Sequence, residues 1–138
     1  MSVEATVLRR VPLFEGMMDR AIEAIANLAT EEIVAAGHVP VTQGESGDAF
    51  YLVLGGRLSV ARDAVAVQEL AAGAFLGEIA LVDGGPRTAT VTALTGVRVA
   101  VIRREAFASL IDRYSAVRHG ILVALTDRMR RDARNSVD

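Results

Sequence analysis

The chain has 138 residues, of which 51% are hydrophobic and 23% are charged, and its formal net charge is −2. This length suits one domain with one hydrophobic core, and the apolar content excludes a disordered chain. The slight acidic excess disfavours direct binding of nucleic acid, and the absence of cysteine excludes disulfides and thiolate metal sites. No apolar run approaches the roughly 18 residues of a membrane span, so we expect no membrane insertion and a cytoplasmic protein.

The basic residues are unusual, because the chain contains no lysine and all 15 of them are arginines. The planar guanidinium suits phosphate and carboxylate recognition, although a general compositional bias explains the arginine content more simply. The question is therefore which single arginine has a chemical task.

Glycine divides the chain, since ten of its 12 glycines lie between Gly37 and Gly96. Glycine favours tight turns and weakens helices, so the middle is typical of turn-rich β structure and the flanks are typical of helices. We predict one domain over residues 1–138. Its parts are N-terminal helices over about 1–30, a β-roll over about 31–103 and C-terminal helices over about 104–134.

Helical spacing is visible in the N-terminal flank, where Ile22, Ile25 and Ala26 share one face. The middle instead alternates with period 2, as in half-buried strands: Leu58 and Val60 against Ser59; Ala89, Val91 and Ala93 against threonines; and Val97, Val99 and Val101 against Arg98 and Ala100. About eight short strands within some 70 residues predict an antiparallel sandwich, jelly roll or barrel, because the long helical connections of a parallel sheet are missing.

The C-terminal flank predicts two helices. Apolar residues at helical spacing line each of them: Phe107, Leu110 and Ile111 on the first, and Tyr114, Val117, Ile121, Leu125 and Met129 on the second. The second stripe must be buried on the core or on a partner. We favour packing on the core, and a weak homodimer through this helix is the alternative.

One segment, residues 73–91, interrupts the strand pattern. It contains a short helical stretch from Glu78 to Val82, a stop at Gly84-Gly85-Pro86, and Arg87 at the start of the next strand. The free N–H groups of a helix N-terminus attract anions, and Arg87 could add a charge-assisted hydrogen bond. Glu78 would repel an anion, so it suits a sugar hydroxyl. Together these residues favour a ligand that joins a phosphate to a ribose.

A family resemblance rests on this segment. Residues Phe75–Leu81 (FLGEIAL) and Pro86–Val91 (PRTATV) resemble the phosphate-binding cassette of the cyclic nucleotide-binding domain family, which includes catabolite activator proteins, protein kinase A regulatory subunits and cyclic-nucleotide-gated channels. Gly44–Val60 is similar to the hairpin that precedes the cassette, and Val11–Phe14 to the family's N-terminal segment. The similarity covers roughly residues 8–130. It implies a mainly β fold: an antiparallel β-roll with N-terminal helices, a short cassette helix and a C-terminal lid helix.

The resemblance implies a role for each cassette residue. Glu78 would accept a hydrogen bond from the ribose 2′-hydroxyl, and Arg87 would pair with the cyclic phosphate. The family's phosphate cradle and ribose contact imply further ligand-binding positions at Gly77, at the backbone N–H groups of Ile79, Ala80 and Ala89, and at the Thr88 hydroxyl. Two departures, Leu76 in place of a common aromatic residue and Ala74 in place of a common acidic residue, remove none of these contacts.

The remaining implied contacts concern the base. Val60, Val67 and Leu76 would line its pocket, and Leu122, Leu125 or Arg128 of the lid helix would cap it. The resemblance thus implies a bacterial-type regulatory module that binds cAMP, favoured over cGMP, and signals through lid closure to an effector protein or domain. The cyclic nucleotide would be its ligand, with no cofactor. The alternative is a ligand-free protein–protein interaction domain that keeps the fold.

Enzyme and metal sites find no support in the sequence. His38 and His119 lie in separate predicted elements, with no third histidine and no metal-binding spacing between them. The chain also lacks paired carboxylates, a serine elbow and a P-loop. We therefore expect neither catalysis nor a bound metal.

Overall fold

The structure of the chain is a computed structural model that describes residues 3–11, 14–44, 49–76, 89–123 and 126. Residues 115–123 form a further helical segment after the last labelled helix. In chain order the labelled elements are α1 (Ala5–Leu8), α2 (Asp19–Leu28), β1 (Thr30–Val34), β2 (Ala49–Gly55), β3 (Leu58–Arg62), β4 (Val65–Leu70), β5 (Phe75–Leu76), β6 (Thr90–Ala93), β7 (Val97–Arg103) and α4 (Arg104–Arg113).

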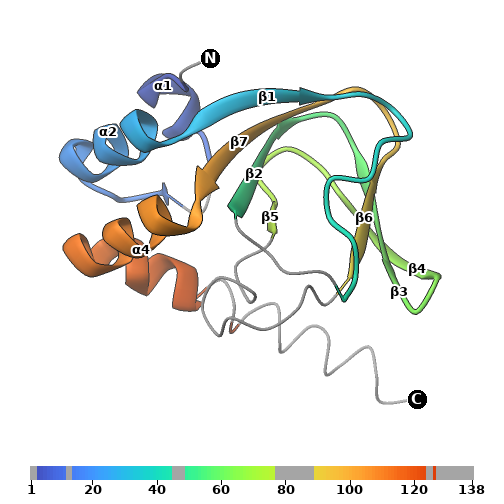
Figure 1. The fold of residues 1–138 in the computed structure, drawn as a ribbon. Coiled ribbons are helices and arrows are strands. Elements are labelled where there is room, and N and C mark those ends of the chain that lie inside the picture. Colours follow the sequence, from blue (N-terminus) through green and yellow to red (C-terminus); the bar gives the residue numbers. More distant parts are fainter. Residues whose placement is uncertain (1–2, 12–13, 45–48, 77–88, 124–125, 127–138) are drawn as a thin grey trace.

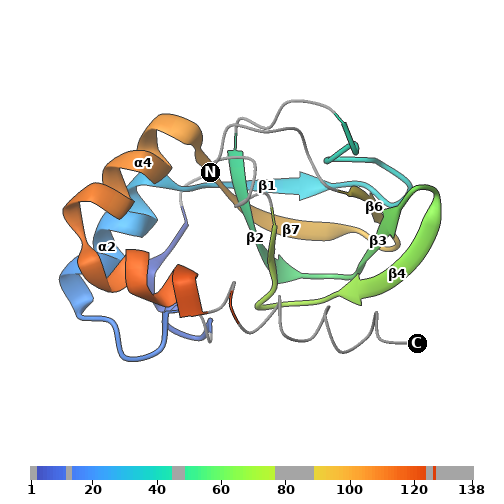
Figure 2. The ribbon, with the colours of Figure 1, turned by 90° about the horizontal axis from the view of Figure 1, so that it is seen from below.

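The strands form two sheets, with the orders β1-β7-β2-β5 and β4-β3-β6, and every pairing is antiparallel. The helices gather at one end of the molecule, while the two sheets curl around an interior at the other end (Figures 1 and 2). This arrangement confirms the predicted class, an antiparallel β-roll with flanking helices.

Strand β7 differs from its predicted half-buried character. Its burial pattern shows exposed side chains only at Arg98 and Arg103, and Ala100 is fully buried. The prediction that Ala100 lies opposite the three valines is correct, but the face it occupies is not exposed. Ala100 and Ile102 belong to a cluster that the helices cover, so β7 is buried on both faces.

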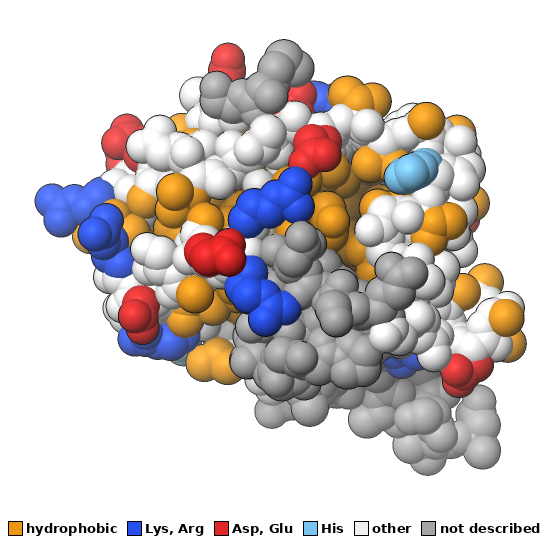
Figure 3. Space-filling view, viewed as in Figure 1, with side chains coloured by type: hydrophobic (Ala, Val, Ile, Leu, Met, Phe, Trp, Pro, Cys, Tyr) orange, Lys and Arg blue, Asp and Glu red, His pale blue; other side chains and the backbone are white. Residues whose placement is uncertain are grey.

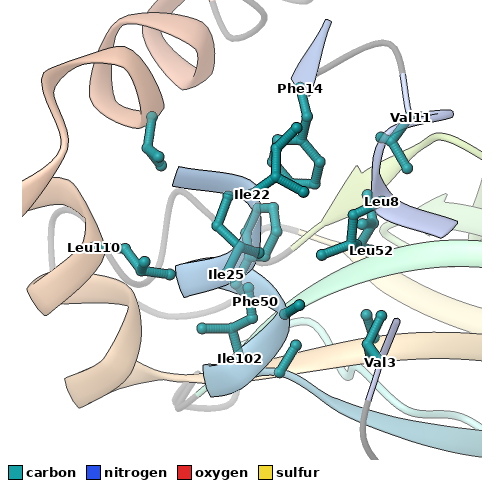
Figure 4. Close-up of a cluster of buried hydrophobic side chains, with 14 of the residues drawn as sticks. Val3, Leu8, Val11, Phe14, Ile22, Ile25, Phe50, Leu52, Ile102 and Leu110 are labelled. Atoms are coloured by element: carbon teal, nitrogen blue, oxygen red, sulfur yellow. The ribbon is translucent and has the colours of Figure 1, made fainter. Parts of the chain in front are cut away.

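The first core cluster, here called the helix-side cluster, joins the helices to the outer face of the larger sheet (Figure 4). The ring of Phe50 in β2 stacks on that of Phe75 in β5 with centroids 5.8 Å apart, and on that of Phe107 in α4 at 5.0 Å. The buried members of this cluster are Val3, Leu8, Val11, Phe14, Ala21, Ile22, Ile25, Ala26, Ala29, Phe50, Leu52, Phe75, Ala100, Ile102, Phe107, Leu110, Val117 and Ile121.

The second core cluster, here called the roll cluster, lies between the two sheets. Strand β2 contributes to both clusters, because its successive side chains point to opposite faces. The buried members of the roll cluster are Val41, Ala49, Val53, Leu58, Val60, Leu76, Ala89, Val91, Ala93, Val97, Val99 and Val101.

The turn between β2 and β3 requires glycine at position 56. Gly56 has a φ of +93°, and a Cβ atom there would lie 2.4 Å from the backbone oxygen of Gly96. Both the conformation and the close approach exclude a larger residue, so this glycine fixes the path of the chain from one sheet to the other. Within the described ranges, no helix is long and apolar enough to cross a membrane.

Candidate functional site

The predicted site residues divide into two groups. Val60, Val67, Leu76, Ala89 and Leu122 lie within the described part of the chain. The others lie outside the described residues, and their predicted roles stay predictions: Gly77, Glu78, Ile79, Ala80, Arg87, Thr88, Leu125 and Arg128.

Leu76 and Ala89 lie near the two ends of the predicted cassette, and both side chains are buried in the roll cluster. Leu76 is 7% exposed and pairs with Tyr51 in the larger sheet. Ala89 is 9% exposed and directly precedes β6 of the smaller sheet. The described residues on either side of 77–88 are therefore both buried in the roll cluster, one in the larger sheet and one directly before a strand of the smaller sheet.

The predicted base-pocket residues occupy different surroundings. Val60 of β3 is 6% exposed, lies opposite Val91 and belongs to the roll cluster together with Leu76. Val67 of β4 is 52% exposed and falls at a register shift between β3 and β4. The structure thus brings Val60 and Leu76 into one apolar interior, whereas Val67 lies on the adjacent hairpin strand outside the cluster.

The predicted lid helix packs on the core through part of its apolar stripe. Val117 and Ile121 are buried in the helix-side cluster, and Tyr114 is packed against it. Leu122, the described lid residue, is 57% exposed and its neighbour Val123 is also exposed. The described part of the stripe is therefore occupied by intramolecular packing, and Leu122 is on the surface.

A polar clasp, made by Gln43, Asp63 and Thr90, lies beside the roll cluster. The side-chain amide of Gln43 donates from Nε2 to Oδ1 of Asp63, and its Oε1 accepts the Asp63 backbone N–H, both at 2.9 Å. The backbone N–H of Gln43 donates to Oγ1 of Thr90, also at 2.9 Å. Gln43 was not among the predicted site residues, since no local sequence pattern indicates a side chain whose hydrogen-bond partners lie 20 and 47 positions away.

Several described arginines make ion pairs that belong to the scaffold. Arg98 of β7 donates to Glu31 of β1 at 2.7 Å, and this hydrogen bond, with the charge of Glu31, raises the pKa of Arg98 above its ordinary value. Arg9 pairs with Asp19, Arg57 with Glu69, and Arg103 with Glu32. These pairs are mostly exposed and brace neighbouring elements, so they do not identify a ligand site.

A hollow of about 410 Å³ opens on the β1 side of the roll. The space-filling view shows hydrophobic side chains lining a hollow on this face, with a histidine nearby (Figure 3). None of the described predicted site residues lines it, and among the described residues no group of three or more potential metal ligands exists. The lining residues are Glu32, Ile33, Val34, Ala35, His38, Pro40, Tyr51, Val99 and Val101.

Comparison with known protein families gives a match over more than half of the chain. Residues 31–114 match the model of the family described as "Cyclic nucleotide-binding domain". This range contains both sheets, α4 and the whole predicted cassette.

Individual proteins give the same result. The chain is 36% identical over 106 residues to a cAMP-dependent protein kinase regulatory subunit of Yarrowia lipolytica. The aligned region covers 75% of this chain and 28% of the relative. The crystal structure of the Thermus thermophilus catabolite activator protein has a TM-score of 0.82 and 26% identity, covering 90% of this chain and 61% of that one. The regulatory domain of Toxoplasma gondii PKA in a co-crystal structure with cAMP has a TM-score of 0.80 and 27% identity, covering 91% and 48%. The chain thus spans less than two thirds of each of these proteins.

Proposed function

Because the chain belongs to the cyclic nucleotide-binding domain family, we propose that it is a regulatory module that binds cAMP. The observation that carries the proposal is the convergence of the cassette's two ends. Leu76 lies in the larger sheet and Ala89 directly precedes β6 of the smaller one, yet both side chains are buried in the roll cluster. The sequence between them contains the glycine, glutamate and arginine of the family's phosphate-binding cassette.

In the proposed complex, the cassette residues divide the ligand between them. Arg87 supplies the counter-charge of the cyclic phosphate, and the N–H groups of Ile79, Ala80 and Ala89 donate to its oxygens. Glu78 accepts the ribose 2′-hydroxyl, Gly77 allows close approach of the backbone, and Thr88 donates to a phosphate oxygen. A small anion held by one arginine agrees with a chain that has no basic excess.

The base is proposed to lie on an apolar wall. Val60 and Leu76 both belong to the roll cluster, and Val67 lies on β4, the strand paired with the strand of Val60. Apolar walls with few polar groups are typical of small-ligand sites. We propose cAMP over cGMP because the names of the kinase regulatory subunit and of the kinase co-crystal structure both specify cAMP. Thr88 is compatible with either nucleotide.

Signalling is proposed to pass from the roll to the C-terminal helices, with Leu122, Leu125 or Arg128 closing over the base. The adjacent residues Phe75 and Leu76 support this route, because Phe75 packs in the helix-side cluster and Leu76 in the roll cluster. A displacement of the cassette that moves Phe75 would therefore also shift Phe50 and Phe107, because the ring of Phe50 stacks on both of the others. Such a change transmits a signal only if cAMP binds the open and closed states with different affinity.

The wider role is also a proposal. The two protein kinase A relatives described above are a regulatory subunit and a regulatory domain, which supports a non-catalytic module. We propose that it acts on an effector protein or domain in the cytoplasm. The nucleotide would be its ligand, without metal or cofactor. A homodimer through the C-terminal helix would use Leu122 and Val123, the exposed apolar residues of its described part. Sedimentation velocity with and without cAMP measures this association.

The test is a competition titration of cAMP and cGMP by calorimetry. We expect saturable binding of cAMP at one site per chain, with cGMP displacing it only at higher concentration. No heat with either nucleotide would contradict the proposed function and would favour the ligand-free interaction domain. Tighter binding of cGMP would overturn the proposed preference but keep the site.

A further inference from the structure

The clasp around Gln43 joins two parts of the molecule that hold opposite ends of the proposed ligand. Thr90 directly follows Ala89, whose N–H is assigned to the phosphate cradle. Asp63 lies in the turn between β3 and β4, the strands that carry Val60 and Val67 of the base wall. Gln43 hydrogen-bonds to both, at 2.9 Å in each of the three contacts.

The segment before Gln43 is itself fixed to the start of β6. The backbone N–H of Val91 donates to the carbonyl of Val41 at 2.8 Å, and these two residues form an isolated β-bridge. The backbone of residues 41–43 is therefore tied to β6, while the side chain of Gln43 reaches the hairpin. Strand β3 is already paired directly with β6 over Leu58–Ala61, so the amide contacts of Gln43 add a tie to the turn at Asp63 and, through it, to β4. A motion of this turn relative to β6 must break them.

The turn that Gln43 holds adopts a costly conformation. Asp63 and Ala64 both have positive φ, at 52° and 67°, as expected for a two-residue turn between antiparallel strands. Alanine is disfavoured there, so the turn depends on contacts from elsewhere. The two hydrogen bonds to Asp63, one to its backbone and one to its carboxylate, restrain the turn and with it the position of β4.

We propose that Gln43 is a positioning residue for the cyclic nucleotide, which holds the β3–β4 turn, and with it β4 and Val67 of the base side, against the start of β6 on the phosphate side. Gln43 does not touch the ligand in this proposal, and the inference rests on the proposed function. Its contribution is preorganisation: without the clasp, the ligand must order the β3–β4 turn and β4 as it binds, and that cost lowers its affinity.

Two variants test the side-chain contacts. Gln43→Glu removes the Nε2 donor and places two carboxylates together, and we expect cAMP affinity to fall about three- to tenfold. When Gln43→Glu is combined with Asp63→Asn, the new amide at position 63 can donate to the new carboxylate at position 43. Affinity should then return to within about twofold of wild type. Asp63→Asn alone completes the double-mutant cycle. Its affinity shows how much of the recovery in the double variant comes from the changed charge at position 63 and how much from the restored hydrogen bond.

A matched pair of threonines tests the link to β6. Thr90 accepts the Gln43 N–H at 2.9 Å, and Thr95, beyond the other end of β6, accepts the Arg57 N–H at 3.0 Å. Thr90→Ala and Thr95→Ala remove similar hydrogen bonds, so both should lower the melting temperature. Only Thr90→Ala should also weaken cAMP binding, by about threefold or more.

The outcomes separate the two proposals. If wild-type protein does not bind cAMP, the proposed function fails and this inference fails with it. If wild-type protein binds but Gln43→Glu keeps its affinity, the double variant is not rescued, or the two threonine variants lose affinity equally, Gln43 has only a structural role and this inference alone is wrong.

Discussion

The two core clusters differ in the size of the side chains that build them. The helix-side cluster contains all four phenylalanines of the chain, together with four isoleucines and three leucines. The buried members of the roll cluster are seven valines, three alanines and two leucines. Large aromatic side chains fill the space between helices and sheet, whereas short branched side chains line the interior between the sheets. Both clusters stabilise the fold by burial, and the roll cluster in addition offers an apolar wall for the proposed ligand.

The largest expected effect comes from the aromatic stack. Phe50→Ala removes the central ring, which contacts both Phe75 and Phe107, and should lower the free energy of unfolding by about 3–5 kcal/mol. Urea unfolding followed by circular dichroism measures the loss. A change below about 1 kcal/mol would show that this stack does not carry the stability of the helix-side cluster.

A matched valine pair separates stability from binding. Val11 of the helix-side cluster and Val60 of the roll cluster are 5% and 6% exposed. Replacing either with alanine should cost about 1–2 kcal/mol of stability, because each loses two buried methyl groups. Only Val60→Ala should weaken cAMP affinity, by about two- to fivefold, in calorimetric titrations. Equal cAMP affinities for the two variants would contradict the claim that only the roll cluster contributes to ligand binding.

A smaller gain is expected at the hairpin turn of the roll. Ala64 has a φ of 67°, and glycine adopts this conformation without steric cost. Ala64→Gly should raise the free energy of unfolding by about 0.5–1 kcal/mol, less than the full steric relief, because glycine also gains freedom in the unfolded chain. Thermal denaturation detects the change. Destabilisation by glycine would show that the turn is not strained.

The smallest effect is expected at the ion pair between β1 and β7. Arg98→Gln removes a charge from an exposed surface, so stability should change less than in Ala64→Gly. The raised pKa of Arg98 gives stability that is present below the ordinary pKa of arginine and is lost only as pH rises through the higher folded value. The arginine itself therefore adds no pH dependence near neutrality. Melting curves of wild type and variant across the neutral range check this.

Local patterns in the sequence were sufficient for the fold class. The clustering of glycine, the period-2 runs around Val60 and Val99, and the helical stripe through Val117 each follow from local geometry. The burial of both faces of β7, which includes Ala100, was not predictable in this way, because period-2 alternation does not show that α4 folds back onto the second face.

The candidate site was predictable to a smaller extent. The buried positions of Val60, Leu76 and Ala89 follow from strand alternation and from the family resemblance. The exposure of Val67 does not, since β4 lies at the edge of its sheet and is exposed from Val65 to Glu69 on both faces. The Gln43 clasp needs three separate segments in their final positions, and hydrogen bonds of this kind leave no periodic signal in the sequence.

Binding of cAMP by wild-type protein and by Arg87→Leu tests the central claim most directly. The leucine leaves the cyclic phosphate without its counter-charge, so we predict saturable binding by wild type and an affinity at least about tenfold lower for the variant, with both proteins equally folded by circular dichroism. Equal affinity of the two proteins would contradict the assignment of the phosphate site to the cassette.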